Sequence, residues 1–278
     1  MKKVNQYSKN RSLERALQII CAFTFETKKL TLTELSNTLG LHMTTTYRLA
    51  QTLLDYGFLE FDEVTKQYSL GLKLMEIGSI VFNSFSIGKV ASPALNELLA
   101  KVGNKNVVLA IFRNDEIVYI AKKEDPRNPI QFATTEVGRH RPPYFGMFGL
   151  LFLAFMPEGE VERILKKNPL TAFTNKSILD VNQFKAKLGE VRQEGYALDD
   201  GMAFEGLSGL AVPIWNHEGR VVAGVGISFI TKVVDNEELE YLIECAKEVA
   251  RKIEKRLPTV KPPVKMNSPR CKQRGIPS

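Results

Sequence analysis

The sequence has little of what marks secreted, membrane-spanning or zinc-binding proteins. Among 278 residues there are three cysteines, Cys21, Cys245 and Cys271, which lie far apart and form no CxxC pair, so neither a disulfide framework nor a zinc ribbon is expected. The longest apolar run, residues 144–156, is shorter than the roughly 18 residues of a membrane span. The N-terminus is basic but lacks the apolar core and cleavage site of a secretory signal. We therefore expect a cytoplasmic protein without a membrane partner.

Sequence signatures of enzymes are also scarce. The three histidines lie in separate segments, and neither GxSxG nor HExxH occurs, which argues against the common hydrolase and zinc sites. The pair Gly224 and Gly226 lacks the third glycine of a dinucleotide-binding loop. His217 and Glu218 stand side by side, but segment 216–219 between two apolar runs is most simply a hairpin turn. No enzymatic activity, cofactor or metal is expected.

In composition the chain is an ordinary globular protein, with 44% hydrophobic and 25% charged residues, and its length is enough for two domains. The net charge is +7, but four basic residues lie in 1–11 and five in 259–278, where acidic residues are absent. Of 38 basic residues, the other 29 face 31 acidic ones, so the interior is slightly acidic. Basic ends either contact phosphates or simply keep a protein in solution.

The first 20 residues contain one helical stripe. Leu13, Ala16, Leu17 and Ile20 follow the i, i+3, i+4, i+7 spacing of a buried helix face, and Ser12 is in position to cap that helix. The pattern predicts a first helix that begins after Ser12.

A second and a third helix are predicted to follow. Thr31 and Glu34 fit a capping box, and Gly40 stands where a left-handed helix end is needed. The third helix is predicted from about Met43, with an exposed face of threonines and one arginine. A hydroxyl bonds a phosphate or a base edge, and the threonine methyl touches a thymine methyl, so this face suits DNA.

Two short strands, 58–61 and 67–70, flank the polar turn 62–66 and predict a β-wing. A short helix, a glycine turn and a second helix are typical of a helix-turn-helix, whose second helix lies in the major groove of DNA. A three-helix bundle with a hairpin and no DNA-binding role gives the same pattern and is the alternative.

Beyond the wing, the pattern predicts a linker helix and a second domain. Apolar residues recur every three to four residues from Gly71 to about Gly88, and Ser92 with Pro93 is typical of the start of a further helix. The residues after Pro258 are rich in proline and basic side chains, which predicts a disordered tail. Strands are expected at 106–112, 117–122, 196–199, 207–214 and 221–229, and helices at 145–155, 158–167, 180–194 and 235–256, an order typical of an α/β sheet domain.

The N-terminal segments resemble the bacterial isocitrate lyase regulator (IclR) family of transcription factors. The resemblance rests on SLERALQII at 12–20, LTELSNTLGLHMTTTYRLAQTLLDYGFLE at 32–60 and YSLGLKLMEIGS at 68–79. Lys66 stands where the family's wing turn usually has glycine, which we expect to change turn geometry more than function. Together with the basic arm, the resemblance implies a set of candidate DNA-binding residues: Arg11, Thr33, Thr44, Thr45, Thr46, Tyr47, Arg48 and Lys66.

The C-terminal part resembles the family's GAF-like domain, which binds a small metabolite and mediates oligomerisation. The matching segments, 137–154 and 194–213, have drifted. In the first, Gly146 and Leu150 stand where the family usually has Ser or Thr and Lys. In the second, Met202, Ser208 and Gly209 replace the usual Glu, Arg and Cys.

These replacements predict a more apolar pocket than the family's. Arg139 is placed to bond an effector carboxylate bidentately, or it is a solvated loop arginine, and the aromatic residues near 145–148 either line the pocket or belong to the core. The effector is expected to be a carboxylate or an apolar or aromatic metabolite. The candidate effector-binding residues are Gly138, Arg139, Tyr144, Phe145, Met147, Phe148, Leu207, Ser208, Gly209, Leu210 and Ser228.

The predicted fold is α+β, with a winged helix-turn-helix domain at 1–70, a linker helix at 71–89, a GAF-like α/β effector domain at 90–258 and a basic tail at 259–278. We expect a repressor controlled by a small-molecule metabolite. One helix-turn-helix reads only a short half-site, so a homodimer or homotetramer on a palindromic double-stranded DNA operator is expected. The alternative is a metabolite-binding or scaffold protein that has lost specific DNA binding, because residues 12–80 carry six basic and eight acidic residues.

Overall fold

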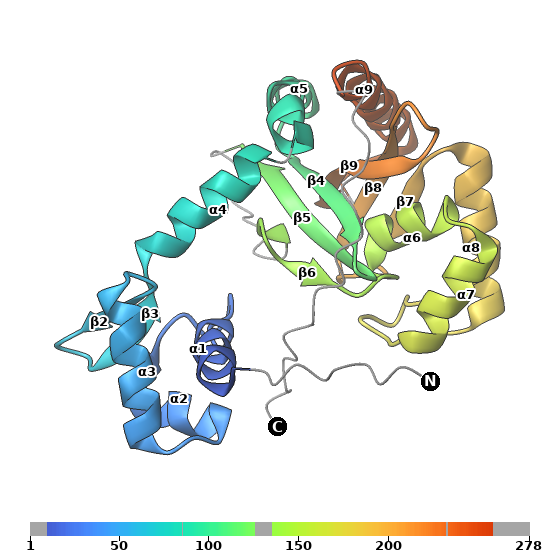
Figure 1. Cartoon of the computed structure of the whole chain (residues 1–278). Helices are drawn as coiled ribbons and strands as arrows, with labels where there is room; N and C mark the ends of the chain where they lie inside the picture. The colour runs from blue at the N-terminus through green and yellow to red at the C-terminus, as the bar shows by residue number, and fades with distance from the viewer. Residues whose placement is uncertain (1–9, 85, 126–134, 232, 258–278) are drawn as a thin grey trace, which may run out of the picture. The chain divides into compact units, whose positions relative to one another are not determined.

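The computed structural model describes residues 10–84, 86–125, 135–231 and 233–257. The chain divides between residues 84 and 85 into two compact units, and Figure 1 labels all their helices and strands except β1. The predicted linker helix at 71–89 spans this division. The basic arm at 1–9 and the predicted tail lie outside the described residues.

The first unit begins with α1 (Arg11–Cys21), which starts two residues before a Ser12 cap would place it. Asn10 is the N-cap: its side-chain oxygen accepts hydrogen bonds from the backbone N–H groups of Ser12, at 3.1 Å, and Leu13, at 3.2 Å. These bonds satisfy two donors that a helix leaves unpaired at its start. The predicted Ser12 cap is therefore wrong, because asparagine two residues upstream supplies the acceptor.

The next two helices, α2 (Leu32–Leu39) and α3 (Met43–Asp55), form the predicted helix-turn-helix. The capping box at the start of α2 is confirmed, since Glu34 N–H donates to the Thr31 hydroxyl at 3.3 Å and Thr31 N–H donates to the Glu34 carboxylate at 2.7 Å. Gly40 ends α2 in the left-handed region, with φ of 62°. The buried Ser36 donates its hydroxyl to the carbonyl of Leu41, which fixes the turn between the two helices.

A small antiparallel sheet with the strand order β1-β3-β2 completes the winged fold. Its strands are β1 (Leu30–Thr31), β2 (Leu59–Asp62) and β3 (Gln67–Leu70). The sequence did not predict β1, because two residues are too few to show an alternating pattern. In the turn between β2 and β3, Lys66 has φ of 56°, a conformation that glycine adopts without strain and a lysine does not.

The core of the first unit lies where α1, α2 and α3 meet the sheet. Its most enclosed side chains include Ile19, Leu35 and Ala50, all with no exposed surface. Leu13 and Leu17, which the sequence placed on the buried face of α1, are 58% and 51% exposed. The prediction is thus confirmed for Ala16 and Ile20, which pack on the core, and wrong for Leu13 and Leu17, because helical spacing fits two adjacent faces of α1 equally well. The face of α1 that packs on the core carries Ala16, Ile19 and Ile20, and Phe23 beyond the end of the helix joins the same core.

Two helices follow the wing, α4 (Leu72–Ser84) in the first unit and α5 (Ser86–Val102) in the second. Pro93 lies inside α5 rather than at its start, so the helix start predicted at Ser92 is wrong. An interior proline costs about 3 kcal/mol because it removes a hydrogen bond and crowds the preceding turn. Complete burial of Leu95 and Leu98 on the same helix offsets that cost.

The second unit is built on a six-stranded antiparallel sheet with the order β6-β5-β4-β9-β8-β7. Asn114 and Asp115, with φ of 55° and 62°, form the tight turn between β4 and β5. The hairpin turn predicted at 216–219 is confirmed, since Asn216 N–H donates to the Arg220 carbonyl at 2.9 Å. The strands are β4 (Asn106–Arg113), β5 (Glu116–Lys123), β6 (His140–Arg141), β7 (Ala197–Asp200), β8 (Leu207–Trp215) and β9 (Val221–Ile230).

Helices cover both faces of this sheet (Figure 1). On β4, Val107 and Leu109 pack in one core with α5 and α9, whereas Val108 and Ala110 pack in the other core with α6, α7 and α8. All nine residues of α6 are buried, which explains why the sequence shows an unbroken apolar run there. The helices beyond α5 are α6 (Gly146–Ala154), α7 (Glu158–Lys167), α8 (Val181–Glu194) and α9 (Asn236–Glu254).

The predicted α+β fold with an N-terminal winged helix-turn-helix is confirmed by these elements. In the described part of the chain, no helix is both long and apolar enough to cross a membrane. The same residues contain no group of three His, Cys, Asp or Glu side chains placed to hold a metal ion.

Candidate functional site

The exposed side of α3 carries polar residues of the predicted DNA-binding set. Thr44 and Arg48 lie four residues apart and are both exposed, and Tyr47 is 47% exposed. The Tyr47 hydroxyl accepts a hydrogen bond from the side-chain amide of Gln51 at 3.1 Å. A threonine hydroxyl, a phenol and a guanidinium on one helix supply donors for phosphate oxygens and for base edges.

The three consecutive threonines at the start of α3 differ in accessibility. Thr44 is exposed, Thr45 is half-buried and Thr46 has no exposed surface. The Thr46 hydroxyl donates to the carbonyl of His42 at 3.2 Å, a bond within the first turn of the helix. The geometry thus gives Thr46 a stabilising contact inside the protein, whereas the predicted set placed it on the DNA-facing surface.

The other predicted DNA contacts lie on neighbouring elements of the same unit. Thr33 is exposed in the first turn of α2, and Arg11 is exposed at the start of α1. Lys66 is exposed in the wing turn, with its ammonium 3.7 Å from the Glu63 carboxylate. An ion pair between two exposed side chains contributes at most about 1 kcal/mol, so Lys66 is able to leave Glu63 for a phosphate.

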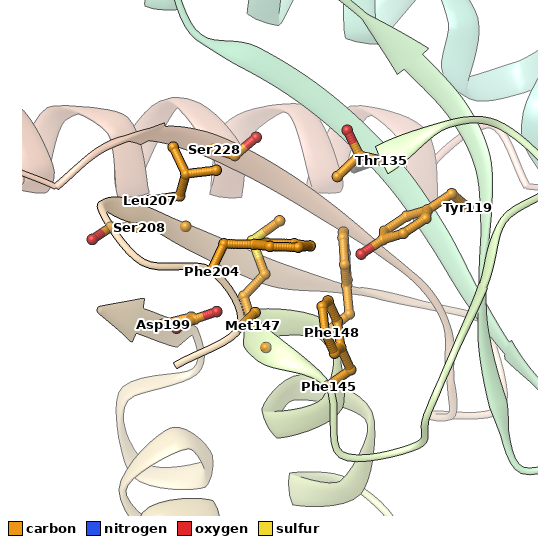
Figure 2. A pocket seen from close by; sticks show the side chains of 13 residues that line it. Tyr119, Thr135, Phe145, Met147, Phe148, Asp199, Phe204, Leu207, Ser208 and Ser228 are labelled. Atoms are coloured by element: carbon orange, nitrogen blue, oxygen red, sulfur yellow. The ribbon is translucent and has the colours of Figure 1, made fainter. Parts of the chain in front are cut away.

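The second unit contains a cavity between the sheet and the start of α6 (Figure 2). The empty space between its lining atoms, open mouth included, is about 440 Å³. Most of the lining is apolar or aromatic. The residues that line it are Tyr119, Thr135, Phe145, Gly146, Met147, Phe148, Asp199, Ala203, Phe204, Leu207, Ser208, Gly209 and Ser228.

Seven of the eleven predicted effector-binding residues line this cavity and four do not. Leu210 lies in the core on the opposite face of the sheet. Arg139 forms an ion pair with Glu136 at 2.8 Å, and the Tyr144 hydroxyl lies 2.9 Å from that of Thr171. Gly138 donates its N–H to the carbonyl of Tyr119. The seven in the lining are Phe145, Met147, Phe148, Leu207, Ser208, Gly209 and Ser228.

Glycines in the sheet let α6 approach closely. A Cβ atom on Gly209 would lie 2.6 Å from the sulfur of Met147, and one on Gly226 would lie 2.8 Å from Cζ of Phe148. Both distances are shorter than real contacts allow. The sulfur of Met147 therefore fills the space beside Gly209, the position at which the family pattern has a cysteine.

One acidic side chain, Asp199, is enclosed in the cavity wall. It is 5% exposed, and burial raises the pKa of its carboxyl to about 6 although backbone hydrogen bonds favour the charged form. Its Oδ1 atom accepts the N–H of Met202 at 2.6 Å. Its Oδ2 atom lies 2.8 Å from where a Cβ of residue 146 would be. Gly146 thus leaves room for this carboxylate, and the Ser or Thr of the family pattern would collide with it.

Aromatic rings form much of the remaining wall. The rings of Phe145 and Phe204 meet edge to face with centroids 5.3 Å apart. Burial raises the pKa of Tyr119 to about 12, so its hydroxyl is neutral at physiological pH. Figure 2 shows this hydroxyl and one Asp199 oxygen directed towards the aromatic rings in the middle of the view. Arg141 stacks on Phe145, with its guanidinium carbon 4.7 Å from the ring centroid, and does not belong to the lining.

Sequence reasoning missed six lining residues. For two of them a pattern was present: Tyr119 and Asp199 lie on strands, and period-two alternation assigns each to one face of the sheet. Gly146 was noted only as a departure from the family. Ala203 and Phe204 lie outside the helices and strands, and Thr135 lies in a 3-10 turn, where no periodicity indicates which way a side chain points.

Comparison with known proteins places both units in one family. Residues 12–63 match the model of the IclR helix-turn-helix domain, and residues 80–255 match that of the bacterial transcriptional regulator IclR C-terminal domain. The HTH-type transcriptional regulator XynR of Escherichia coli (strain K12) is 34% identical over 228 residues, which cover 82% of this chain and 89% of XynR.

Solved structures show the same architecture. An IclR-type transcriptional regulator from Alicyclobacillus acidocaldarius matches with a TM-score of 0.79 and 30% identity over 90% of this chain and 99% of that one. An IclR homologue from Microbacterium hydrocarbonoxydans, complexed with 4-hydroxybenzoate, shares the fold at a TM-score of 0.77 and 21% identity over 88% and 98% of the two chains. Because both domain models match in order and together cover most of the sequence, the protein belongs to the IclR family of bacterial transcriptional regulators, with a DNA-binding domain followed by an effector-binding domain.

Proposed function

We propose that the protein is a cytoplasmic repressor that binds a palindromic operator as a homodimer or homotetramer and is controlled by a small molecule in the cavity of its second unit. The observation that carries the proposal is the exposed polar surface of α3 in a winged helix-turn-helix. That surface consists of Thr44, Tyr47 and Arg48.

A single copy of this surface reads only a few base pairs. The guanidinium of Arg48 suits the two acceptors of guanine in the major groove, and the hydroxyl and methyl of Thr44 suit a phosphate or a thymine. Two copies with their recognition helices about 34–36 Å apart would read two half-sites on one face of DNA. The operator is therefore expected to be an inverted repeat.

Exposed apolar side chains on the first unit support self-association. On α4, Leu72, Met75 and Ile80 are 73%, 70% and 64% exposed, and Leu13 and Leu17 of α1 are more than half exposed. Each large apolar side chain that becomes fully buried contributes about 1.5–3 kcal/mol. A second copy of this chain is a partner that would cover these residues while bringing two recognition helices together.

The effector acts by binding one arrangement of the protein more tightly than another, because a ligand with equal affinity for both shifts nothing. The aromatic wall of the cavity supports a ligand with an apolar face. Arg139 gives little support for a carboxylate held at its guanidinium, since its partner is Glu136 and it lies outside the lining.

Of the two directions of regulation, repression requires fewer contacts with the transcription machinery. A protein bound at a promoter blocks RNA polymerase by occupying its site, whereas activation requires a surface that contacts the polymerase. A reporter gene under the bound promoter distinguishes repression from activation. Expression of the reporter should rise when the regulator gene is deleted and fall when the regulator gene is restored.

DNA binding is tested by fluorescence anisotropy of the full-length protein with labelled DNA from upstream of its own gene, at near-physiological salt. Specific binding is expected to survive an excess of unrelated competitor DNA, because specific sites are typically bound about 10³-fold or more tightly than others. Binding that competitor abolishes would count against a sequence-specific regulator. Analytical ultracentrifugation of the same sample should give a dimer or tetramer, and a monomer would exclude the proposed assembly.

A further inference from the structure

Several buried polar groups on the cavity side of the sheet have no hydrogen-bond partner among the described residues. They are the hydroxyls of Thr135 and Ser228 and both polar atoms of the Asn106 side-chain amide. Thr135 is 6% exposed and Asn106 has no exposed surface. Thr135 and Ser228 line the cavity, and Figure 2 shows them along the same side of it.

Asn106 extends this polar surface along the sheet. It lies directly opposite Ser228 in the antiparallel pairing of β4 and β9, so the two side chains project from the same face of the sheet. Their neighbours Val107 and Ile227 pack on the opposite face, which places Asn106 and Ser228 on the cavity side.

A buried donor or acceptor without a partner destabilises the folded state, so three such residues in one place require an explanation. Ser208 provides the contrast within the same lining. Its hydroxyl is hydrogen-bonded to Asp200 at 3.0 Å and to Thr231 at 2.9 Å, and in Figure 2 it points away from the other lining groups. Thr135, Ser228 and Asn106 therefore have the hydrogen-bonding capacity to pair with a ligand.

The charge in the cavity favours hydroxyl groups over a carboxylate. Asp199 is an acceptor in the wall, and among the described lining residues none is basic. The nearby cations have other neighbours: Lys176 pairs with Asp200 at 3.0 Å, and Arg141 stacks on Phe145 and Phe204. A ligand carboxylate close to Asp199 would meet a like charge, whereas ligand hydroxyls would donate to it.

From this arrangement we propose that the cavity binds a small polyhydroxylated molecule, such as a cyclic polyol or a sugar. Its hydroxyls donate to Asp199 and pair with Thr135 and Ser228, the two unpaired hydroxyls of the lining. Its C–H face lies against the aromatic wall that includes Phe145 and Phe204. This inference rests on the proposed role of the cavity as the effector site and names the chemistry of the effector.

A thermal-shift panel on the full-length protein tests the ligand class. The probes are the uncharged polyols myo-inositol, D-glucose and D-galactose, the sugar acids D-gluconate and D-galactonate, and the hydroxyl-free carboxylates benzoate and acetate. At about 100-fold excess over its dissociation constant, a ligand raises the melting temperature by roughly 5–10 °C. A shift with an uncharged polyol supports the proposal, and a shift with a sugar acid alone contradicts the argument from Asp199. Shifts with the hydroxyl-free acids alone, or with no probe, overturn it.

Substitutions separate ligand recognition from folding. Because their hydroxyls are unpaired in the protein, Ser228→Ala and Thr135→Val should leave the melting temperature without ligand unchanged or higher, yet weaken the ligand that shifts the wild type at least tenfold. A site that pairs with a ligand hydroxyl loses much of its affinity when one partner is removed. Ser208→Ala is the structural control: it should lower the melting temperature, because it leaves the hydrogen-bond partners of a paired hydroxyl without a partner. Lower melting temperatures for Ser228→Ala and Thr135→Val with unchanged affinity would show that these hydroxyls are structural, and the proposal would fail.

Asp199→Asn tests the acceptor. The amide oxygen still accepts the N–H of Met202, but the amide nitrogen no longer accepts a ligand hydroxyl, so affinity should fall at least tenfold, while Asp200→Asn, outside the lining, should change it less than threefold. Equal affinity of the Asp199 variant and the wild type would contradict the assigned role. Operator binding of the ligand-free protein is measured in parallel. If the wild-type protein does not bind operator DNA, the proposed function is refuted. If it binds operator DNA but no probe raises its melting temperature, only this inference is refuted.

Discussion

Asp199 connects burial, charge and stability at the level of a single side chain. Burial raises the pKa of its carboxyl from 3.8 to about 6, so the folded protein holds this proton more tightly than the unfolded chain does. Below about pH 4, where the carboxyl is protonated in both states, it does not lower the free energy of unfolding. The free energy of unfolding then falls as the pH rises from about 4 to about 6. A shift of about two pKa units corresponds to roughly 3 kcal/mol. Exposed carboxyls with lowered pKa values, such as that of Asp62, act in the opposite direction.

Asp199→Asn should consequently stabilise the protein above pH 6 by about 1–3 kcal/mol, because it removes a buried charge. The gain should shrink towards pH 4, where the wild-type carboxyl is already protonated. Urea unfolding of variant and wild type at pH 4.5, 6 and 8 gives the difference directly. A difference that stays constant across these values would mean that Asp199 has an ordinary pKa in the folded protein.

Lys66 combines a strained backbone with the phosphate contact assigned to the wing turn. Its φ of 56° costs a residue with a side chain roughly 1 kcal/mol. Lys66→Gly should relieve that strain and raise the melting temperature, while removal of the ammonium weakens operator binding. Lys66→Gln is the matched control, since it removes the charge but keeps the strain: it should weaken binding equally and leave the melting temperature unchanged. Unaltered operator affinity in both variants would exclude Lys66 as a DNA contact.

At the scale of helices and strands, the sequence predicted most of the fold because capping residues and turn residues mark element ends. Thr31 with Glu34 and Gly40 defined α2, and Asn216 with Gly219 marked the β8–β9 turn. It failed where two physical solutions fit one pattern. The spacing of α1 allowed two adjacent faces to be buried, and Pro93 is as compatible with a first helical turn as with an interior position whose neighbours are well packed.

The cavity was predicted less completely than the fold. Phe145, Met147 and Phe148 were found because they follow a recognisable segment of the family. Asp199 was missed because a carboxylate in a strand reads as a solvated residue until tertiary packing encloses it. Phe204 lies in a loop and Thr135 in a 3-10 turn, and the course of such segments depends on contacts distant in the sequence.

The close packing of α6 on the sheet gives a prediction for these elements. A Cβ on Gly224 would lie 2.6 Å from Cδ2 of Leu151 and 3.0 Å from Cε1 of Phe148, so Gly224→Ala should destabilise the protein by about 1–3 kcal/mol through overpacking. Gly189 of α8 is the control, because a Cβ on this residue would have no other atom within 4 Å. Gly189→Ala should stabilise by about 0.5–1 kcal/mol, the usual gain within a helix. Equal effects of the two substitutions in urea unfolding would contradict this packing.

For the whole molecule, the basic N-terminal arm is a candidate source of DNA affinity, because its lysines carry no neighbouring acidic residue. Deletion of residues 2–9 removes three lysines and leaves Asn10, which caps α1, in place. If all three contact phosphates, the slope of log K against log salt should become shallower by up to about 2.7, since each contact contributes roughly 0.9. An identical slope for truncated and full-length protein would show that the arm does not contact DNA.

The account as a whole depends on α3 being the element that reads DNA. The most direct test is the anisotropy-measured affinity of Arg48→Ala and Thr46→Val for the upstream DNA, with circular dichroism to confirm folding. Arg48 is exposed, and its replacement should cost at least tenfold in specific affinity, about 1–3 kcal/mol for a bidentate base contact. Thr46 is buried, and its replacement should change the affinity less than threefold. Wild-type affinity in Arg48→Ala, or a larger loss in Thr46→Val than in Arg48→Ala, would contradict the assignment of this surface to DNA.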